Sequence, residues 1–356
     1  MRLAGLILIF TMAARAQEAG SGFDLRTTIS TASFYSHELT DKPREGAALS
    51  GGLRAMLYPT WKIGSHWTVS SAVQLRSRPY SDEEFETQGY GVRGDLMQLN
   101  LSYSRFWRNR SLVVRVGQLS TAFGAFLPRY DAADNPLFGM PPSYGYYKGV
   151  TVLGLAGAQV DATVGKVDLR AQFVNSSPSN RRSVFDRDQY GNWAGGGGYT
   201  IRQGFRVGGS ASYGPYLHRQ YAFYFPGEAN PRDLPAFAYG LDVQWGKGPW
   251  NAWGELQHFR MDYRLIPTFT EHAGYAELRR VLNPRWYAAT RISYLRASAF
   301  QGFQNYEIAA GFRPNRYQLL KFDYRFMQGA AYNGTLGNTA AIELVTSFRA
   351  ISLARD

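Results

Sequence analysis

Residues Val150–Val174 read VTVLGLAGAQVDATVGKVDLRAQFV, two segments of alternating character on either side of Gly165-Lys166. After that pair, apolar side chains alternate with polar ones: Val167, Leu169, Ala171 and Phe173 against Asp168, Arg170 and Gln172. Side chains two residues apart lie on the same face of a strand, and glycine supplies the positive φ that a tight hairpin needs. The stretch therefore predicts a β-hairpin with one apolar and one polar face.

The same rhythm continues along the chain in both directions. Short turns are predicted at Pro59–His66, Trp107–Arg110, Gly165–Lys166, Arg202–Gly204, Gly246–Pro249, Asn283–Pro284 and Pro314–Asn315. Longer, polar connections are predicted near 36–47, 77–93, 120–148, 176–192, 215–235, 264–271, 298–303 and 329–338. Such alternation of turns and loops is typical of an outer-membrane barrel. We predict an all-β fold, a transmembrane antiparallel β-barrel of about 16 strands with short periplasmic turns and long extracellular loops.

The apolar face of each strand is expected to contact lipid and the polar face to line a water-filled lumen. One strand is assigned outward Met97, Leu99, Leu101 and Tyr103 against inward Gln98, Asn100, Ser102 and Ser104. Aromatic residues beside the short turns are expected to form an interfacial girdle: Trp61, Trp67, Phe106, Trp107, Trp250, Trp286 and Tyr287. The run Gly195–Gly198 is interpreted as bends or bulges in a strand.

The first residues predict export from the cytoplasm. Arg2 precedes an apolar run that ends at Phe10, and Ala14-Arg15-Ala16 follows as a small-x-small cleavage pattern. We interpret 1–16 as a signal peptide cleaved near Ala16 and 17–356 as one outer-membrane barrel domain. No later segment has eighteen uninterrupted apolar residues, which a membrane-spanning helix requires.

Composition excludes several kinds of site. The chain has no cysteine, which excludes disulfides, iron–sulfur clusters and thiolate zinc sites. The five histidines form no metal-binding motif: His37, His66, His218, His258 and His272. No sequence feature brings a nucleophile, a base and an oxyanion hole together. We predict no enzymatic activity, no cofactor and no metal.

Charge predicts the partners. The net charge is +12, from 33 arginines and 6 lysines against 27 acidic residues. An exported protein has no access to nucleic acid, so small anionic solutes, outer-membrane lipid and lipopolysaccharide are the expected partners. The strand phases place these bases in the lumen: Arg76, Arg78, Arg115, Arg170, Arg206, Arg291, Arg313, Lys321 and Arg325. They predict an anion preference, unless they pair with lumen acids such as Asp168, Asp242, Glu307, Asp323 and Glu343 to stabilise the wall.

The longest connection, predicted over 121–148, is rich in proline and aromatic residues, which restrict its backbone and give it something to pack. We predict that it folds into the barrel as a constriction loop, with Phe123, Gly124, Arg129, Asp131 and Asp134 in it. The alternative is an external loop over the mouth. Inside, Asp131 and Asp134 would face basic wall residues, and the resulting transverse field would select solutes by charge.

The stretch Arg115–Gly124, RVGQLSTAFG, is similar to the Gly-Gln-x-x-x-x-Phe-Gly junction between the fifth strand and third loop in porins of the phosphate-selective (O/P-like) family. This resemblance implies a homotrimeric diffusion channel, with Gly117, Gln118, Phe123 and Gly124 at the entry to the constriction loop. Ala122 stands where that family usually has proline.

Together, these observations predict an outer-membrane porin for passive diffusion of small hydrophilic, preferentially anionic solutes through an arginine-rich pore. The alternatives are a channel specific for a sugar or an organic acid, and a closed barrel with a structural or adhesin role.

Overall fold

The computed structural model describes residues 21–36, 49–77, 91–144, 154–177, 190–217, 234–263, 267–298, 300–329 and 338–353. These residues form sixteen strands: β1 Gly22–Ser36, β2 Leu49–Ile63, β3 Trp67–Ser77, β4 Val92–Trp107, β5 Arg110–Leu119, β6 Leu155–Val164, β7 Val167–Val174, β8 Asn192–Arg202, β9 Phe205–Pro215, β10 Pro235–Lys247, β11 Trp250–Met261, β12 Phe269–Val281, β13 Trp286–Ala297, β14 Phe300–Phe312, β15 Gln318–Gly329 and β16 Thr339–Ser352. Two short 3-10 helices, η2 Leu127–Arg129 and η3 Pro142–Tyr144, lie between β5 and β6.

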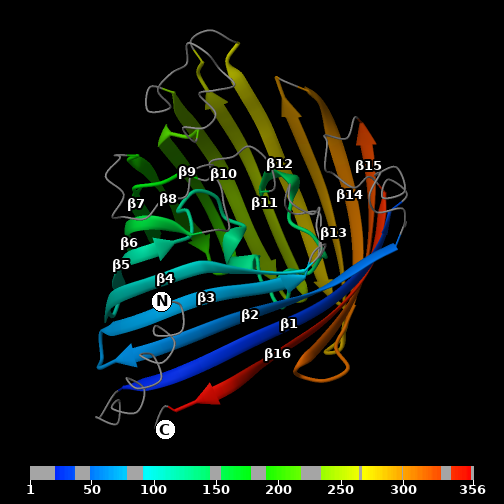
Figure 1. Cartoon of the computed structure of the whole chain (residues 1–356), viewed down its shortest axis with the longest axis horizontal. Coiled ribbons are helices and arrows are strands. Elements are labelled where there is room, and N and C mark those ends of the chain that lie inside the picture. The colour runs from blue at the N-terminus through cyan, green and yellow to red at the C-terminus, as the bar shows by residue number, and fades with distance from the viewer. Residues whose placement is uncertain are drawn as a thin grey trace.

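The strands form one closed antiparallel ring (Figure 1). Each strand pairs with its neighbours in sequence, and β1 closes the ring against β16 from Asp24–Ser352 to Ser36–Thr339. Closure leaves no unpaired sheet edge, which a strand-built membrane protein requires. The prediction of a sixteen-stranded antiparallel barrel is confirmed.

Short connections gather at one end of the ring. They span 64–66, 108–109, 165–166, 203–204, 248–249, 282–285 and 313–317, at or within a few residues of the seven predicted turns. Gly165 has a φ of 59°, as the two-residue hairpin needs. At the other end, only residues 298–299 separate β13 from β14, so the loop predicted over 298–303 is shorter than expected. Phe303 there packs inward against Leu295, which extends the strand.

Outward and inward positions differ as the period-two pattern predicts. In β13 the residues alternate between exposed and buried along the whole strand. Large apolar side chains are exposed at the outward positions, among them Leu169, Leu241, Leu256, Ile292, Ile308 and Ile342. The outer surface is therefore apolar around a ring one sheet thick, as in a barrel that lipid surrounds.

In the described part of the chain, no helix has the length and apolar character needed to cross a membrane.

Two inward-facing side chains differ from the sequence prediction. Ala72 pairs with Gln98 but Val73 pairs with Leu96, so Met97 is the extra residue of a β-bulge. The bulge turns Met97 inward, where it is 3% exposed, and its predicted outward position is wrong. Tyr287 is also buried in the interior rather than in the girdle, because its hydroxyl donates to the Pro136 carbonyl at 2.9 Å.

The glycine run in β8 forms regular strand, not a bulge. Gly195–Gly198 pair in continuous register with β7 and β9. A Cβ at Gly198 would collide with the Arg206 guanidinium, and one at Gly208 would lie 2.5 Å from an Asp242 carboxylate oxygen. The interpretation of this run as bends or bulges is wrong, and Gly198 and Gly208 instead leave room for Arg206 on the inner wall.

Candidate functional site

The described part of the segment between β5 and β6 crosses the interior of the ring, where Figure 1 draws it in blue-green. Its side chains Phe123, Phe126 and Leu137 are at most 1% exposed and pack against inward-facing wall residues. Residues 120–144 of this segment are named the inner loop below. Residues 145–148 of the predicted 121–148 loop lie outside the described residues.

Side chains of the adjoining strands hold the first turn of the inner loop. Gln172 on β7 accepts from the Ala122 amide at 3.0 Å and donates to the Ser120 carbonyl at 2.7 Å. Gly124, with a φ of 84°, donates to the Ser210 hydroxyl at 3.0 Å and accepts from Arg170 at 3.1 Å. The predicted lumen base Arg170 therefore contacts the loop backbone.

A buried tyrosine joins the two ends of the described loop to the far wall. The Tyr144 hydroxyl accepts from the amides of Ala125 and Phe126 at 2.8 and 2.9 Å and donates to Glu255 on β11 at 2.5 Å. Burial and the nearby Glu255 carboxylate raise the pKa of Tyr144 well above its ordinary value. The hydroxyl thus stays protonated and keeps its donor role.

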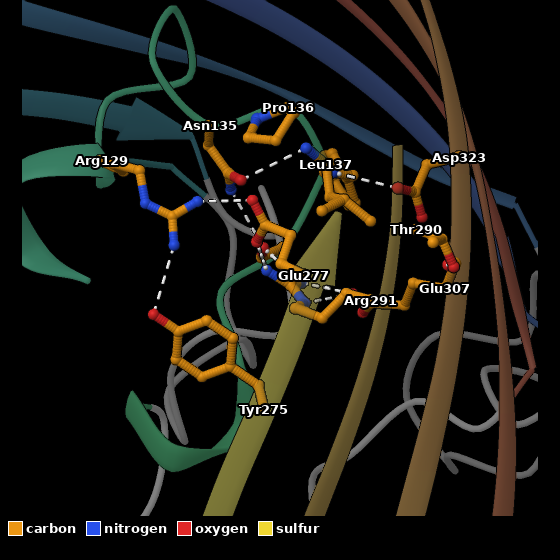
Figure 2. A network of polar contacts seen from close by, with 12 residues as sticks. Arg129, Asn135, Pro136, Leu137, Tyr275, Glu277, Thr290, Arg291, Glu307 and Asp323 are labelled. Carbon is orange, nitrogen blue, oxygen red and sulfur yellow. Dashed lines mark hydrogen bonds and ion pairs between the residues drawn. The ribbon is translucent and has the colours of Figure 1, made fainter. Parts of the chain in front are cut away.

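Arg129 begins a charge network that joins the loop to β12, β13 and β14 (Figure 2). Its guanidinium donates to Glu277 at 2.5 Å and to the Tyr275 hydroxyl at 3.2 Å. Arg291 continues the network at 3.5 Å from Glu277, and it also pairs with Glu307 through an Nε–Oε2 bond of 2.6 Å. These side chains are nearly or fully buried, so each charge needs its partner.

Segment 135–139 of the loop is bound to the opposite wall through its backbone. Arg291 donates to the Gly139 carbonyl at 2.7 Å, and the Phe138 amide donates to Asp323 at 3.2 Å. Lys321 lies 3.4 Å from the Leu137 carbonyl and pairs with Glu343 at 2.9 Å. The loop is consequently bonded to β13 and β15, on the side of the ring opposite its own strands.

The other predicted lumen bases differ in their partners. Arg206 bonds Asp168 at 2.6 and 2.8 Å and Asp242 at 2.6 Å, and Arg115 pairs with Asp161. Arg76 is buried in register between Arg54 and Arg93, Arg325 donates to Thr339 at 3.3 Å, and Arg313 is half-buried beside the β14–β15 turn. Arg78 lies outside the described residues. Arg115, Arg206, Arg291 and Lys321 therefore follow the alternative prediction of wall-stabilising pairs.

Three arginines near the short-turn end are arranged differently. Among the described residues, no acidic side chain makes an ion pair or hydrogen bond with Arg26, Arg279 or Arg313. Arg26 lies 4.7 Å from the centroid of the Tyr58 ring, and Arg279 lies 5.8 Å from that of Tyr287. Arg26 and Arg279 were not predicted as lumen bases.

The acidic side chains of the inner loop face β1 and β2. Asp131 accepts from the Tyr58 hydroxyl at 2.6 Å, and Asp134 is exposed beside it. A cavity between the loop and the β1–β4 wall is lined by Arg26, Met56, Tyr58, Ala72, Met97, Gln98, Ser120, Leu127, Pro128, Tyr130, Asp131 and Asp134. Although its surface is exposed to the cavity, partial desolvation by the surrounding loop and wall raises the pKa of Asp134, and repulsion from Asp131 adds to this.

Histidine and acidic residues form no metal centre in the described ranges, where no group of three such side chains could hold an ion. His258 and His272 lie on the outer surface with their Nδ1 atoms 3.3 Å apart, and His66 lies at a turn. His37 and His218 are outside the described residues.

Sequence reasoning missed two carboxylates that hold the inner loop, Glu255 and Glu277. Glu277 lies in a stretch with charges on both faces, which obscures its orientation. Alternation alone would have placed Glu255 inward, beside Gln257, but its partner Tyr144 is 111 residues away in sequence. The alternation within a strand can predict that such a residue faces inward, but it cannot predict which distant residue it contacts.

No protein-family model matches the chain. No curated protein matches its sequence either. Solved structures do share its fold. The anion-selective porin from Comamonas acidovorans is 11% identical with a TM-score of 0.62, over 92% of this chain and 100% of that one. OmpF of Salmonella typhi, in complex with daunomycin, is 12% identical with a TM-score of 0.64, over 92% and 97%. OmpT of Vibrio cholerae in a trimer form is 9% identical with a TM-score of 0.58, over 92% and 100%. The chain thus has the fold of outer-membrane barrels, and its resemblance to O/P-like porins stays a prediction.

Proposed function

We propose that this chain is a porin of the bacterial outer membrane through which small hydrophilic solutes diffuse passively, with a preference for anions. The observation that carries the proposal is a closed ring of strands with an apolar outer surface and a charged inner surface. The inner loop crosses this ring and is hydrogen-bonded to its far wall. Polar wall groups replace part of a solute's hydration while the loop sets size and charge limits. Such diffusion needs no catalytic turnover.

The anion preference is assigned to three arginines that have no acidic partner among the described residues. The ion pairs of Arg206, Arg291 and Lys321 largely cancel their charges at a distance. Arg26, Arg279 and Arg313 lie toward one end of the lumen. No acidic side chain of the described residues pairs with them, so their positive charges raise the local concentration of anions there. Asp131 and Asp134 lie on the loop side, so the field runs across the passage as well as along it.

Planar-bilayer recording in a salt gradient tests both parts of the proposal. We expect stepwise conductance and a reversal potential directed toward anions. Replacing Arg26, Arg279 and Arg313 by glutamine should move the reversal potential toward cations, whereas Arg296→Gln, on the outer face of β13, should not. Absence of conductance would contradict a channel, and a cation-directed reversal potential in the unaltered protein would contradict the charge preference. Phosphate added as a blocker tests the O/P-like resemblance.

The proposal includes maturation and assembly. Cleavage near Ala16 would release a barrel of 17–356, which mass spectrometry of the membrane-inserted protein tests. A homotrimer in contact with lipopolysaccharide is proposed by analogy with the trimer form of Vibrio cholerae OmpT. Native mass spectrometry from mild detergent would detect both the trimer and retained lipid.

A further inference from the structure

The cavity between the inner loop and β1–β4 is lined by one cationic side chain, Arg26, and two acidic ones, Asp131 and Asp134. Arg26 forms no ion pair with either aspartate. The Arg26 guanidinium carbon lies 4.7 Å from the centroid of the Tyr58 ring, and the Tyr58 hydroxyl donates to Asp131 at 2.6 Å. The phenol ring therefore stands between guanidinium and carboxylate. A cation–π contact of this kind uses the guanidinium charge but none of its N–H groups, which stay available to other acceptors.

Arg26 is consequently suited to bind a carboxylate from a solute. It makes no side-chain hydrogen bond or ion pair with any acidic group of the described chain. A guanidinium has five N–H donors in a fork that matches two carboxylate oxygens. A carboxylate entering the cavity would meet this fork on the wall side.

Asp134 offers the complementary charge on the loop side. Its amide donates to the Asp131 carbonyl at 2.9 Å, but its carboxylate accepts no hydrogen bond from the described residues and is exposed to the cavity. Asp131 is already occupied by the Tyr58 hydroxyl and by the Ala133 amide at 2.9 Å. An ammonium group beside Asp134 would offset the repulsion between the two aspartates.

Apolar side chains also line the cavity, among polar ones. Met56 and Met97 are 2% and 3% exposed, and Leu127 packs against the same cluster. The bulge that turns Met97 inward contributes directly to this surface. Thioether and leucine side chains adapt to apolar groups of varied shape.

We infer that this cavity binds small zwitterions whose ammonium and carboxylate groups flank an apolar segment, the class to which short apolar peptides belong. A plain anion would meet two carboxylates here and a plain cation would meet Arg26, so neither is matched as well. The inference rests on the proposed function, because solutes reach the cavity only through the lumen.

Isothermal titration calorimetry on the detergent-solubilised protein tests this site directly. The probes are the dipeptide Leu-Leu, its N-acetyl form without the ammonium, and its C-terminal amide without the carboxylate, each also titrated into empty micelles. Because each cap removes one charge-assisted contact, we expect the free dipeptide to bind about tenfold more tightly than either capped form.

Variants separate the two contacts. Arg26→Gln should abolish the preference over the amide and retain that over the acetyl form, and Asp134→Asn should do the reverse. Arg296→Gln and Asp262→Asn, both exposed outside the cavity, are the charge-matched controls and should bind as the unaltered protein does. Circular dichroism verifies that each variant is folded.

The outcomes for site and channel are distinguishable. Equal affinity for the three probes, or no binding by folded protein that conducts ions, overturns the zwitterion site and leaves the channel proposal standing. Dipeptide binding with the expected order but without conductance in bilayers supports the site and overturns the proposed function.

Discussion

Removal of one hydroxyl, in Tyr144→Phe, should loosen the inner loop without unfolding the barrel. The hydroxyl satisfies the amides of Ala125 and Phe126 and donates to Glu255. Ala125 keeps a second acceptor, Glu255 Oε1 at 3.2 Å, and the same oxygen keeps the Gln257 amide at 2.8 Å. The substitution therefore leaves the buried Phe126 amide without its acceptor, and it also removes the hydrogen bond from Tyr144 to Glu255 Oε2.

The unsatisfied backbone donor alone costs about 2 kcal/mol, which raises the ratio of detached to packed loop at least about thirtyfold. Hydrogen exchange followed by mass spectrometry should show that increase in the peptide that contains Ala125 and Phe126. Amides in β13 should keep their protection, because strand pairing does not involve Tyr144. Tyr324→Phe, at an exposed outward position of β15, is the matched control. Unchanged exchange at Ala125 and Phe126 in the folded variant would refute the anchoring role of Tyr144.

Three further predictions concern the wall and the loop carboxylate. Arg291→Met should lower unfolding stability by about 3 to 5 kcal/mol because it leaves a buried carboxylate unpaired; adding Glu307→Leu should restore much of the loss in denaturant titrations, and an additive loss would contradict the pairing. Gly198→Ala should lower the thermal midpoint more than Gly246→Ala, since its methyl group meets a guanidinium whereas the nearest atom at Gly246 is 3.4 Å away; equal effects would count against that contact. The pKa of Asp134 lies above its ordinary value, so its ionisation opposes folding at neutral pH and stability should improve as pH falls through the raised pKa. Anion preference should rise over the same range as the negative charge is lost, and this rise should be absent in Asp134→Asn.

Period-two alternation and turn chemistry were sufficient to predict the ring. The alternation in Val167–Val174 and the glycine at the Gly165 turn depend only on neighbouring residues in the sequence. The same strand pattern recurs in sixteen strands, so local signals are enough to predict the barrel. Met97 escaped the same reasoning because a bulge shifts phase by one residue without leaving a glycine or proline to mark it. A phase error of one residue moves a side chain to the other face of the sheet.

The site was less predictable because its contacts join distant parts of the chain. Several predicted lumen bases do face inward, but Arg206 and Arg291 are bonded to acids on neighbouring strands rather than left free. Arg129 meets Glu277 across 148 residues, which strand phase cannot specify. Tyr287 illustrates the same limit: its aromatic ring beside a turn fits a girdle until its loop partner is known.

The inner loop leaves the wall at β5 and is bonded at β13, eight strands away in a ring of sixteen. A cylinder held only by hydrogen bonds between adjacent strands flattens easily, since small changes in the angle between neighbouring strands add up to an oval cross-section. A strut across the diameter resists that distortion. Tension or crowding in the surrounding bilayer should then alter the outline of this cylinder less than that of an unbraced one.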